Sequence, residues 1–400
     1  MAVKELIFLD ISNFDTISAV TLSGMFQECK SLTKIEFPKF NTTLVENMNS
    51  LFKDCISLTS LDLSKFKTEN CLSFSLMFEN CISLQNLALS NFVTNKAVMM
   101  NNMFTNCSSL INLDISNFNT KEVVSMEKMF EDCISLENVD VSNFEGDNVK
   151  IINYMFDNCK SITTINLSKF KTPDLRNMLK VFNNCSSLEY LNINKLETNQ
   201  IENFDSLFFG CESLTSLNLS SFDTGKATHF SNMFKNCSKL TSLDLSNFDG
   251  KTAYAYFSMF ENCISLKYLN LDNFNTKEAT DMNSMFRNCQ SLNSINLNSF
   301  NTQKAFRLAY MFYDCKSLTS LSLISFKTER ASDISFMFYG CSSLDELDIS
   351  SFNTGKCSNY KSIFDECKHN MTLKINPNNC NNIYSIIPEY INIVNITSHY

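Results

Sequence analysis

The chain has 400 residues, a formal net charge of −9 and 44% hydrophobic residues, with 36 Phe, no Trp, and only 7 Gly and 4 Pro. This composition allows a large core, and the acidic balance argues against a nucleic-acid partner, because phosphate contacts require a basic face. Residues 1–14 contain no basic segment followed by a long apolar run, so no secretory signal is predicted. No apolar stretch approaches the roughly 18 residues that a membrane helix needs.

A repeat of 26 residues runs along the chain. The octapeptide MFENCISL occurs at residues 77–84 and again at 259–266, which is seven periods later. Fourteen of the 17 cysteines stand 26 residues apart without an insertion or deletion, and a Phe precedes each of them by three residues. A period of this length predicts a solenoid, in which each repeat buries its apolar face only by stacking on its neighbours. The series is Cys29, Cys55, Cys81, Cys107, Cys133, Cys159, Cys185, Cys211, Cys237, Cys263, Cys289, Cys315, Cys341 and Cys367.

Each repeat predicts a strand first. Counted from the Cys, apolar residues at +3, +6 and +8 form the pattern LxxLxL, whose last part has the period of two of a strand. Phe follows at +11, and Thr stands at +13 in most repeats, where its hydroxyl would cap the N-terminus of a helix.

A short helix is predicted next. Apolar residues at +16, +19, +22 and +23, such as Val123, Met126 and Phe130, are spaced for about three helical turns of α or 3₁₀ type. The residue before the Cys is Asn, Asp or Gly in 12 of 14 repeats, including Gly210 and Gly340. These residues tolerate the left-handed conformation that ends a helix.

The predicted fold is an α/β solenoid, a right-handed leucine-rich-repeat arc. About 14 parallel strands would form one sheet on its inner face, on the order of 60 Å long at the usual strand spacing, with short helices on the outer face. The predicted domains are a solenoid over residues 1–376 and an irregular C-terminal cap or tail over residues 377–400. Repetition begins inside a repeat, because Leu6, Leu9, Ile11 and Phe14 match strand positions with no preceding helix. We therefore expect either a missing segment that covers this end or an excised part of a longer protein.

The motif MFxxCxSLxxLxLSxFxT, as in residues 233–250 and 337–354, resembles that of the BspA-like leucine-rich-repeat surface proteins. It is similar to the variety with a repeat of this length found in mycoplasmas and other bacteria, and the resemblance covers about residues 3–376. The resemblance implies surface display, adhesion and ligand binding, and it brings no catalytic residues with it. The Pro typical of the strand ending occurs only as Pro38.

The cysteine series is predicted to be reduced and buried. The only histidines are His229, His369 and His399, which disfavours zinc sites and Cys–His nucleophiles. A ladder of equivalent thiols gives each Cys two identical neighbours, which disfavours unique disulfides, and free Cys packs as a small hydrophobe. The Phe and Met series are predicted to be stacked core. We expect no enzyme, no cofactor and no metal.

The candidate binding residues stand at +5 and +7, where strand side chains point away from the core. Position +7 is mostly Asp or Asn, and +5 is mostly Ser, Thr or Asn, with Tyr at two repeats. One interpretation is a solvated ladder of mutually bonded Asn side chains; the other is a concave groove for a basic or polar partner, with the two Tyr as anchors. A third, Ca²⁺ held by neighbouring carboxylates, has no dedicated loop to support it. The candidates are Asp114, Asp140, Asn166, Tyr190, Asn192, Asn218, Asp244, Tyr268 and Asn270.

The sequence therefore predicts a non-enzymatic leucine-rich-repeat binding protein that is displayed on a cell surface and recognises a protein or glycan partner. The alternative is an intracellular, cytoplasmic protein-interaction scaffold, which the missing secretory signal and the many free thiols favour.

Overall fold

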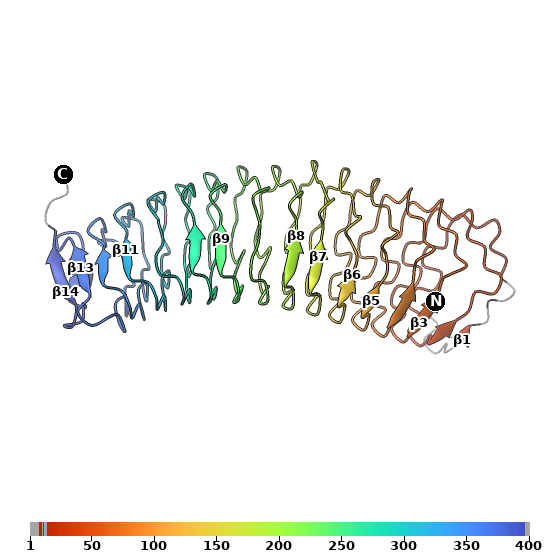
Figure 1. Cartoon of the computed structure of the whole chain (residues 1–400), viewed down its shortest axis with the longest axis horizontal. Helices are drawn as coiled ribbons and strands as arrows, with labels where there is room; N and C mark the ends of the chain where they lie inside the picture. The colour runs from red at the N-terminus through yellow and green to blue at the C-terminus, as the bar shows by residue number, and fades with distance from the viewer. Residues whose placement is uncertain (1–7, 10, 12–13, 397–400) are drawn as a thin grey trace. The chain divides into compact units, whose positions relative to one another are not determined.

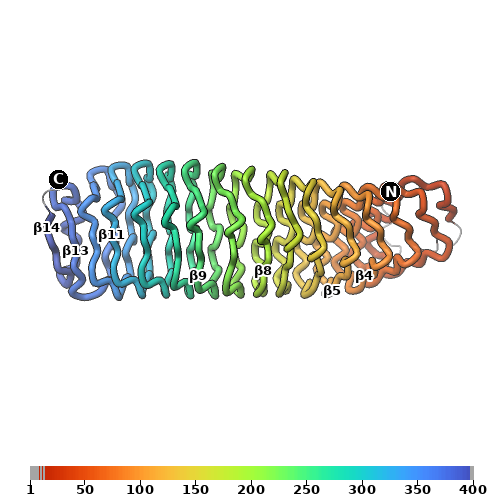
Figure 2. The backbone as a smooth tube through the Cα atoms, turned by 45° about the horizontal axis from the view of Figure 1, so that its top comes forward, coloured from red at the N-terminus to blue at the C-terminus, as the bar shows by residue number. Residues whose placement is uncertain are grey.

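The computed structural model describes residues 8, 9, 11 and 14–396, so the predicted strand positions Leu6 and Asp10 lie outside the described residues. The chain divides into two compact units, unit 1 (Met1–Gln200) and unit 2 (Ile201–Tyr400), and each is described by itself. In both units the backbone winds through successive coils of one repeat each (Figures 1 and 2). We call the side of a coil that carries the strand the strand side, and the opposite side the turn side.

The strands are parallel, as predicted, and are two to four residues long. Each residue pairs with its equivalent one repeat away, as in Leu61↔Leu87 of unit 1 and Leu243↔Leu269 of unit 2. Unit 1 contains β1 (Phe8–Leu9), β2 (Lys34–Ile35), β3 (Ser60–Asp62), β4 (Asn86–Ala88), β5 (Asn112–Leu113), β6 (Asn138–Val139), β7 (Thr164–Asn166) and β8 (Tyr190–Asn192). Unit 2 contains β9 (Ser242–Asp244), β10 (Tyr268–Asn270), β11 (Ser320–Ser322), β12 (Glu346–Asp348), β13 (Thr372–Ile375), α1 (Asn381–Tyr384) and β14 (Asn392–Asn395).

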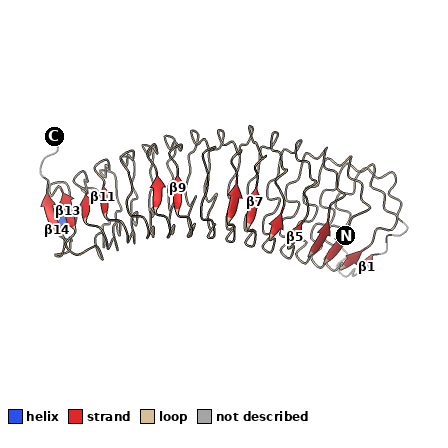
Figure 3. Cartoon of the chain, viewed as in Figure 1, coloured by secondary structure: helices blue, strands red, loops and turns tan. Residues whose placement is uncertain are grey.

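The prediction of one continuous sheet is wrong for the described residues. The strands form five two-stranded pairs and one four-stranded sheet, β11–β12–β13–β14. Residues 216–218 and 294–296 occupy strand positions of the repeat without being strands. Most coils contain a strand of only two or three residues, and Figure 3 shows these short strands separated by long stretches of turn.

The predicted helices on the outer face are also wrong. In the described part of the chain the four residues of α1 are the only helix, and each turn side is a succession of turns (Figure 3). In one such segment the N–H groups of Met100, Asn102 and Phe104 donate to carbonyls of the next coil at 2.8–3.1 Å. The N–H groups of Met103, Thr105 and Cys107 instead donate to the carbonyl three residues back, at 3.4, 3.3 and 3.0 Å. A helix keeps all of these bonds within itself, whereas this segment shares alternate ones with its neighbour.

Left-handed residues explain why a helix cannot form there. The residue before each ladder Cys has positive φ in all fourteen coils, which confirms the predicted left-handed conformation but not the helix it was to end. A second left-handed residue stands four positions earlier, and it includes bulky side chains such as Leu76, Tyr154 and Phe336. A left-handed residue in the middle of a segment is incompatible with a right-handed helix. With turns of i→i+3 type instead, a positive φ at the third residue is the ordinary requirement of a type II turn.

The threonines at +13 do not cap helices but join neighbouring coils. Thr94 is 1% exposed; its Oγ1 donates to the carbonyl of Asn119 (2.9 Å) and accepts the N–H of the same residue (2.7 Å). One hydroxyl thus satisfies both polar groups of a buried peptide in the next coil. The same pair of bonds recurs at Thr68, Thr120, Thr276 and Thr328, among others.

The core consists of the predicted rows of Phe, Leu and Cys. Phe130 is fully buried and stacks on Phe104 and Phe156, with ring centroids 5.6 and 5.1 Å apart. All 17 cysteines are free. The Cys133 thiol donates to the carbonyl of Phe104 in the preceding coil (3.1 Å), and eleven further ladder cysteines make the equivalent bond. Each such bond joins a ladder Cys to the backbone of the ladder Phe in the preceding coil.

Residues 377–396, which the sequence predicts to be an irregular cap or tail, contain α1 and β14. β14 pairs in parallel with β13, for example through Leu373↔Ile393, and Tyr390 stacks on His369 with centroids 4.5 Å apart. The division of the chain at residue 376 stays a prediction. None of the helices in the described residues has the length and apolar character needed to cross a membrane.

Candidate binding groove

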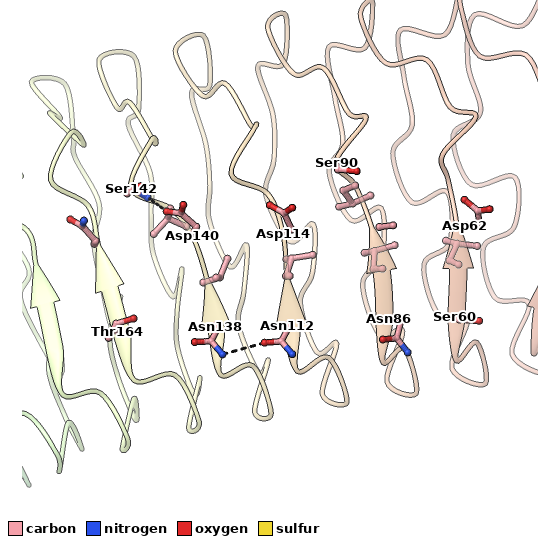
Figure 4. A pocket seen from close by; sticks show the side chains of 18 residues that line it. Ser60, Asp62, Asn86, Ser90, Asn112, Asp114, Asn138, Asp140, Ser142 and Thr164 are labelled. Atoms are coloured by element: carbon pink, nitrogen blue, oxygen red, sulfur yellow. Dashed lines mark hydrogen bonds between the residues drawn. The ribbon is translucent and has the colours of Figure 1, made fainter.

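A groove of about 960 Å³ lies on the strand side of unit 1 (Figure 4). Strands β3 to β7 and the residues that follow them supply its walls, so five successive coils contribute. We call it the strand groove. It is lined by Ser60, Leu61, Asp62, Asn86, Leu87, Ala88, Leu89, Ser90, Asn112, Leu113, Asp114, Asn138, Val139, Asp140, Val141, Ser142, Thr164 and Asn166.

Two rows of polar side chains run across the groove because alternate residues of each strand face it. The amide row, at +5, consists of Asn86, Asn112 and Asn138, with Asn138 Nδ2 donating to Asn112 Oδ1 at 3.2 Å (Figure 4). The leucine or valine between the two rows on each strand faces the core and is buried. The amide row therefore contains one bond of the kind expected for a solvated Asn ladder.

The carboxylate row, at +7, consists of Asp62, Asp114 and Asp140. Each carboxylate accepts, on Oδ1, the backbone N–H of the serine two residues later, at 2.9, 3.2 and 2.9 Å. These are Asx turns, which lead the chain out of the strand. The same bond recurs in unit 2 at Asn218, Asp244 and Asn270, at 3.0–3.1 Å. The Asp/Asn preference at +7 therefore has a structural cause, and its signal in the sequence is the Ser that follows at +9.

The carboxylate row gives the groove a negative potential. The N–H and hydroxyl of Ser64 hold the pKa of Asp62 below its usual value, and the hydroxyl and N–H of Ser142 do the same for Asp140. Both groups are therefore ionised at neutral pH. No Lys, Arg or His lines the strand groove, and the N–H groups of the Asx turns all donate to Oδ1 of their carboxylates.

Ala88 interrupts the carboxylate row. It pairs with Asp62 on one side and with Asp114 on the other, so a carboxylate stands one strand away in each direction. Ala88 is exposed, and its methyl group leaves room where the neighbours carry a carboxylate. At this point the groove therefore has an apolar floor, the Ala88 methyl group, and a carboxylate on either side.

The structure brings only some of the predicted residues together. Asp114, Asp140 and Asn166 line the strand groove, whereas Tyr190 and Asn192 lie on β8, outside its lining. The remaining predicted residues belong to unit 2, where Asn218 is outside any strand: Asn218, Asp244, Tyr268 and Asn270. Tyr190 and Tyr268 are 53% and 56% exposed. Their role as anchors stays a prediction.

Sequence reasoning missed Ala88, Asp62 and the amide row. Asp62 belongs to the same +7 series as the chosen residues, and the three consecutive Asn at +5 were visible as a run. Ala88 was visible only as the one Ala in a column of polar residues. Its meaning depends on the two strands that flank it.

Among the residues that the structure describes, no three His, Cys, Asp or Glu side chains gather as a metal site would require. Asp114 also accepts the Ser116 hydroxyl at 2.7 Å on the oxygen that holds the turn. The arrangement offers charge and hydrogen bonds to a ligand from a fixed scaffold.

Comparison with solved structures shows the leucine-rich-repeat fold. The chain is similar to a leucine-rich repeat protein from Bacteroides ovatus, with a TM-score of 0.56 and 18% identity over 94% of this chain and 86% of that one. A leucine rich cell surface protein from Faecalibacterium prausnitzii gives a TM-score of 0.38 and 16% identity over 82% and 79%. No curated protein sequence matches the chain.

A family model covers nearly all of the repeats. The model described as Mycoplasma protein of unknown function, DUF285, matches residues 2–111, 83–190, 161–268 and 254–376. The resemblance to BspA-like leucine-rich-repeat proteins of the mycoplasma type is confirmed by this match together with the leucine-rich-repeat fold. Since the four matches together span residues 2–376, the chain belongs to the DUF285 family of Mycoplasma proteins of unknown function.

Proposed function

We propose that the chain is a non-enzymatic binding protein that receives a protein partner in the strand groove of unit 1. The observation that supports this most strongly is the groove itself: about 960 Å³, built by five coils and lined by backbone-anchored polar side chains. A volume of this size is in the range of ligand sites. The stacked coils hold the side chains in place, so little ordering entropy is lost on binding.

The partner is a protein, with a glycan as the other outcome. Three carboxylates and four carboxamides line the groove, and amides both donate and accept hydrogen bonds, as a peptide backbone requires. The BspA-like resemblance supports display on a cell surface and a role in adhesion. The unit 2 residues Asp244, Tyr268 and Asn270 would add a second binding surface, proposed on their exposure and their repeat position alone.

Site-specific cross-linking tests the groove as the place of binding. A photo-reactive amino acid is placed at Asn112 in the groove and, as a matched control, at Ser242, which is exposed at the same repeat position on β9 of unit 2. The proposal expects a discrete adduct from position 112 on native cells, and its loss when Ala88→Arg fills the groove. No adduct from position 112, or an adduct that Ala88→Arg leaves unchanged, would contradict the groove as the binding place.

An intracellular scaffold is the second candidate, which the 17 free cysteines favour because exported proteins meet an oxidising environment. Protease treatment of intact cells separates the two. Cleavage of the chain while cytosolic marker proteins stay intact supports surface display. Protection that disappears on lysis supports the scaffold.

A further inference from the structure

We propose that the strand groove recognises a basic side chain, Arg or Lys, of an extended partner segment, and that this side chain lies over Ala88 between Asp62 and Asp114. The inference rests on the proposed function and specifies the partner's chemistry. It starts from the gap at Ala88 in the carboxylate row.

The geometry of the gap fits one long cationic side chain. Asp62 and Asp114 belong to the strands on either side of Ala88, so their backbones stand roughly 10 Å apart, two strand spacings. A side chain that enters between them meets the Ala88 methyl group below and a carboxylate on each side. Lys and Arg combine an apolar stem with a charged head, which matches an apolar floor between two acidic walls.

The polar ends of the gap complete the match. Asn86 and Ser90 stand two residues before and after Ala88 and line the same groove (Figure 4). Their side-chain oxygens can accept further hydrogen bonds from a guanidinium, which has five donors. The Asx turns fix Asp62 and Asp114 through Oδ1, so both carboxylates are oriented before the ligand arrives.

The groove is long enough for a peptide rather than a single residue. From β3 to β7 there are four strand spacings, roughly 19 Å, which corresponds to about six residues of extended chain. Asp140 provides a further negative charge two strands from the gap. Lys65 acts on the Asp62 carboxylate from outside the groove lining and contributes to the lowering of its pKa.

The test uses a fluorescein-labelled hexapeptide of alternating Ser and Arg, titrated with the full chain and followed by fluorescence anisotropy at physiological salt. Matched probes carry citrulline in place of Arg, which keeps the shape and removes the charge. We expect saturable binding of the Arg peptide and at least about tenfold weaker binding of the citrulline peptide, since a hydrogen bond to a charged group contributes that much.

Four variants separate the gap from the general negative charge of the chain. Ala88→Asn fills the gap without changing the charge and should weaken binding about tenfold, whereas Ser322→Asn, the same filling at +7 on β11 of unit 2, should leave it unchanged. Asp114→Asn should weaken binding several-fold, and Asp348→Asn, which removes an equivalent Asx-turn charge on β12 outside the groove, should not. Thermal unfolding of each variant confirms that it is folded.

The inference would be overturned by no binding of the Arg peptide to the unaltered chain, by equal binding after Ala88→Asn, or by equal effects of the Asp114→Asn and Asp348→Asn variants. Spermidine is a competitor in the same assay. If it displaces the peptide at an equal concentration, the groove binds a polyamine, and the inference is overturned. If the cross-link from position 112 forms equally well in the Ala88→Asn chain, the groove binds a partner but the basic side chain is wrong. If that cross-link never forms, the proposed function itself fails.

Discussion

Replacing Gly250 by Thr should destabilise unit 2 unless Tyr256 is replaced at the same time. In the preceding coil Thr224 stands at the position of Gly250, and it accepts the N–H of Asp249 (2.7 Å) and donates to the carbonyl of the same residue (3.2 Å). Gly250 has no hydroxyl. The buried Tyr256 hydroxyl takes over, donating to the carbonyls of Gly250 (3.0 Å) and Asn275 (3.5 Å).

Gly250 and Tyr256 depend on each other, because the Tyr256 hydroxyl occupies space that a Thr side chain fills in most other repeats. A Cβ atom on Gly250 would lie 2.4 Å from the Tyr256 hydroxyl and 2.6 Å from the carbonyl oxygen of Asn275. Gly250→Thr alone should therefore cost about 1–3 kcal/mol through overpacking. Tyr256→Met alone removes a buried hydroxyl and leaves a void, for about 2–4 kcal/mol.

The double variant restores the side chains of neighbouring coils, where Thr276 and Met282 stand at the equivalent positions. Its cost should be at least about 1 kcal/mol smaller than the sum of the two single costs, because Tyr256→Met removes the 2.4 Å contact with the hydroxyl while the contact with the Asn275 carbonyl remains. Native-state hydrogen exchange of the amides in residues 249–282 is the assay, because solenoid coils open locally and a single global free energy of unfolding is poorly defined for such a chain.

Gly146 provides the control. It also stands in place of a threonine, but its coil carries Ile152 where Gly250's coil carries Tyr256. The costs of Gly146→Thr and Ile152→Met should simply add. An additive cycle at positions 250 and 256 would refute the exchange of hydroxyl groups between the two residues.

Three further predictions follow from the core and the strand side. Phe130→Ala should lower the opening free energy of its coil by about 3–5 kcal/mol, as read by native-state hydrogen exchange, because it opens a void between two stacked rings; a near-neutral result would contradict the stacked core. Burial raises the pKa of the Cys133 thiol to about 12, so iodoacetamide at pH 8 should modify the half-exposed Cys29 in the native chain and Cys133 only after unfolding, as read by mass spectrometry. Tyr190→Ala and Tyr268→Ala should leave the unfolding midpoint nearly unchanged, because both side chains are more than half exposed, and should weaken partner binding if they anchor it; unchanged affinity would remove them from the site.

The strands could be predicted from sequence because their period of two and the fixed repeat leave one register. The 26-residue spacing places Leu61 beside Leu87, and the structure pairs them in that way. The helices failed for a physical reason. Apolar spacings of three and four suit a helix, but they equally suit turns closed by i→i+3 bonds, and Leu76 or Tyr154 in a left-handed conformation gives no sequence signal.

The candidate site was predictable only in part. The alternation of the strand identified which residues face away from the core, and Asp114, Asp140 and Asn166 indeed line the groove. The Asx turns were missed because Asp and Asn at +7 were considered as ligand groups, without the Ser at +9 whose N–H they accept. The gap at Ala88 exists because the paired residues on both sides, Asp62 and Asp114, carry carboxylates. An alignment of the repeats shows this only when the strand pairing is known.

Hydrogen exchange of the full chain with and without the Ser/Arg hexapeptide tests the strand groove most directly. Binding there should slow exchange in residues 60–90 and 112–116 of unit 1 and leave β11 and β12 of unit 2 unchanged. Slower exchange on the turn side, or equal protection in unit 2, would contradict the strand groove as the binding surface.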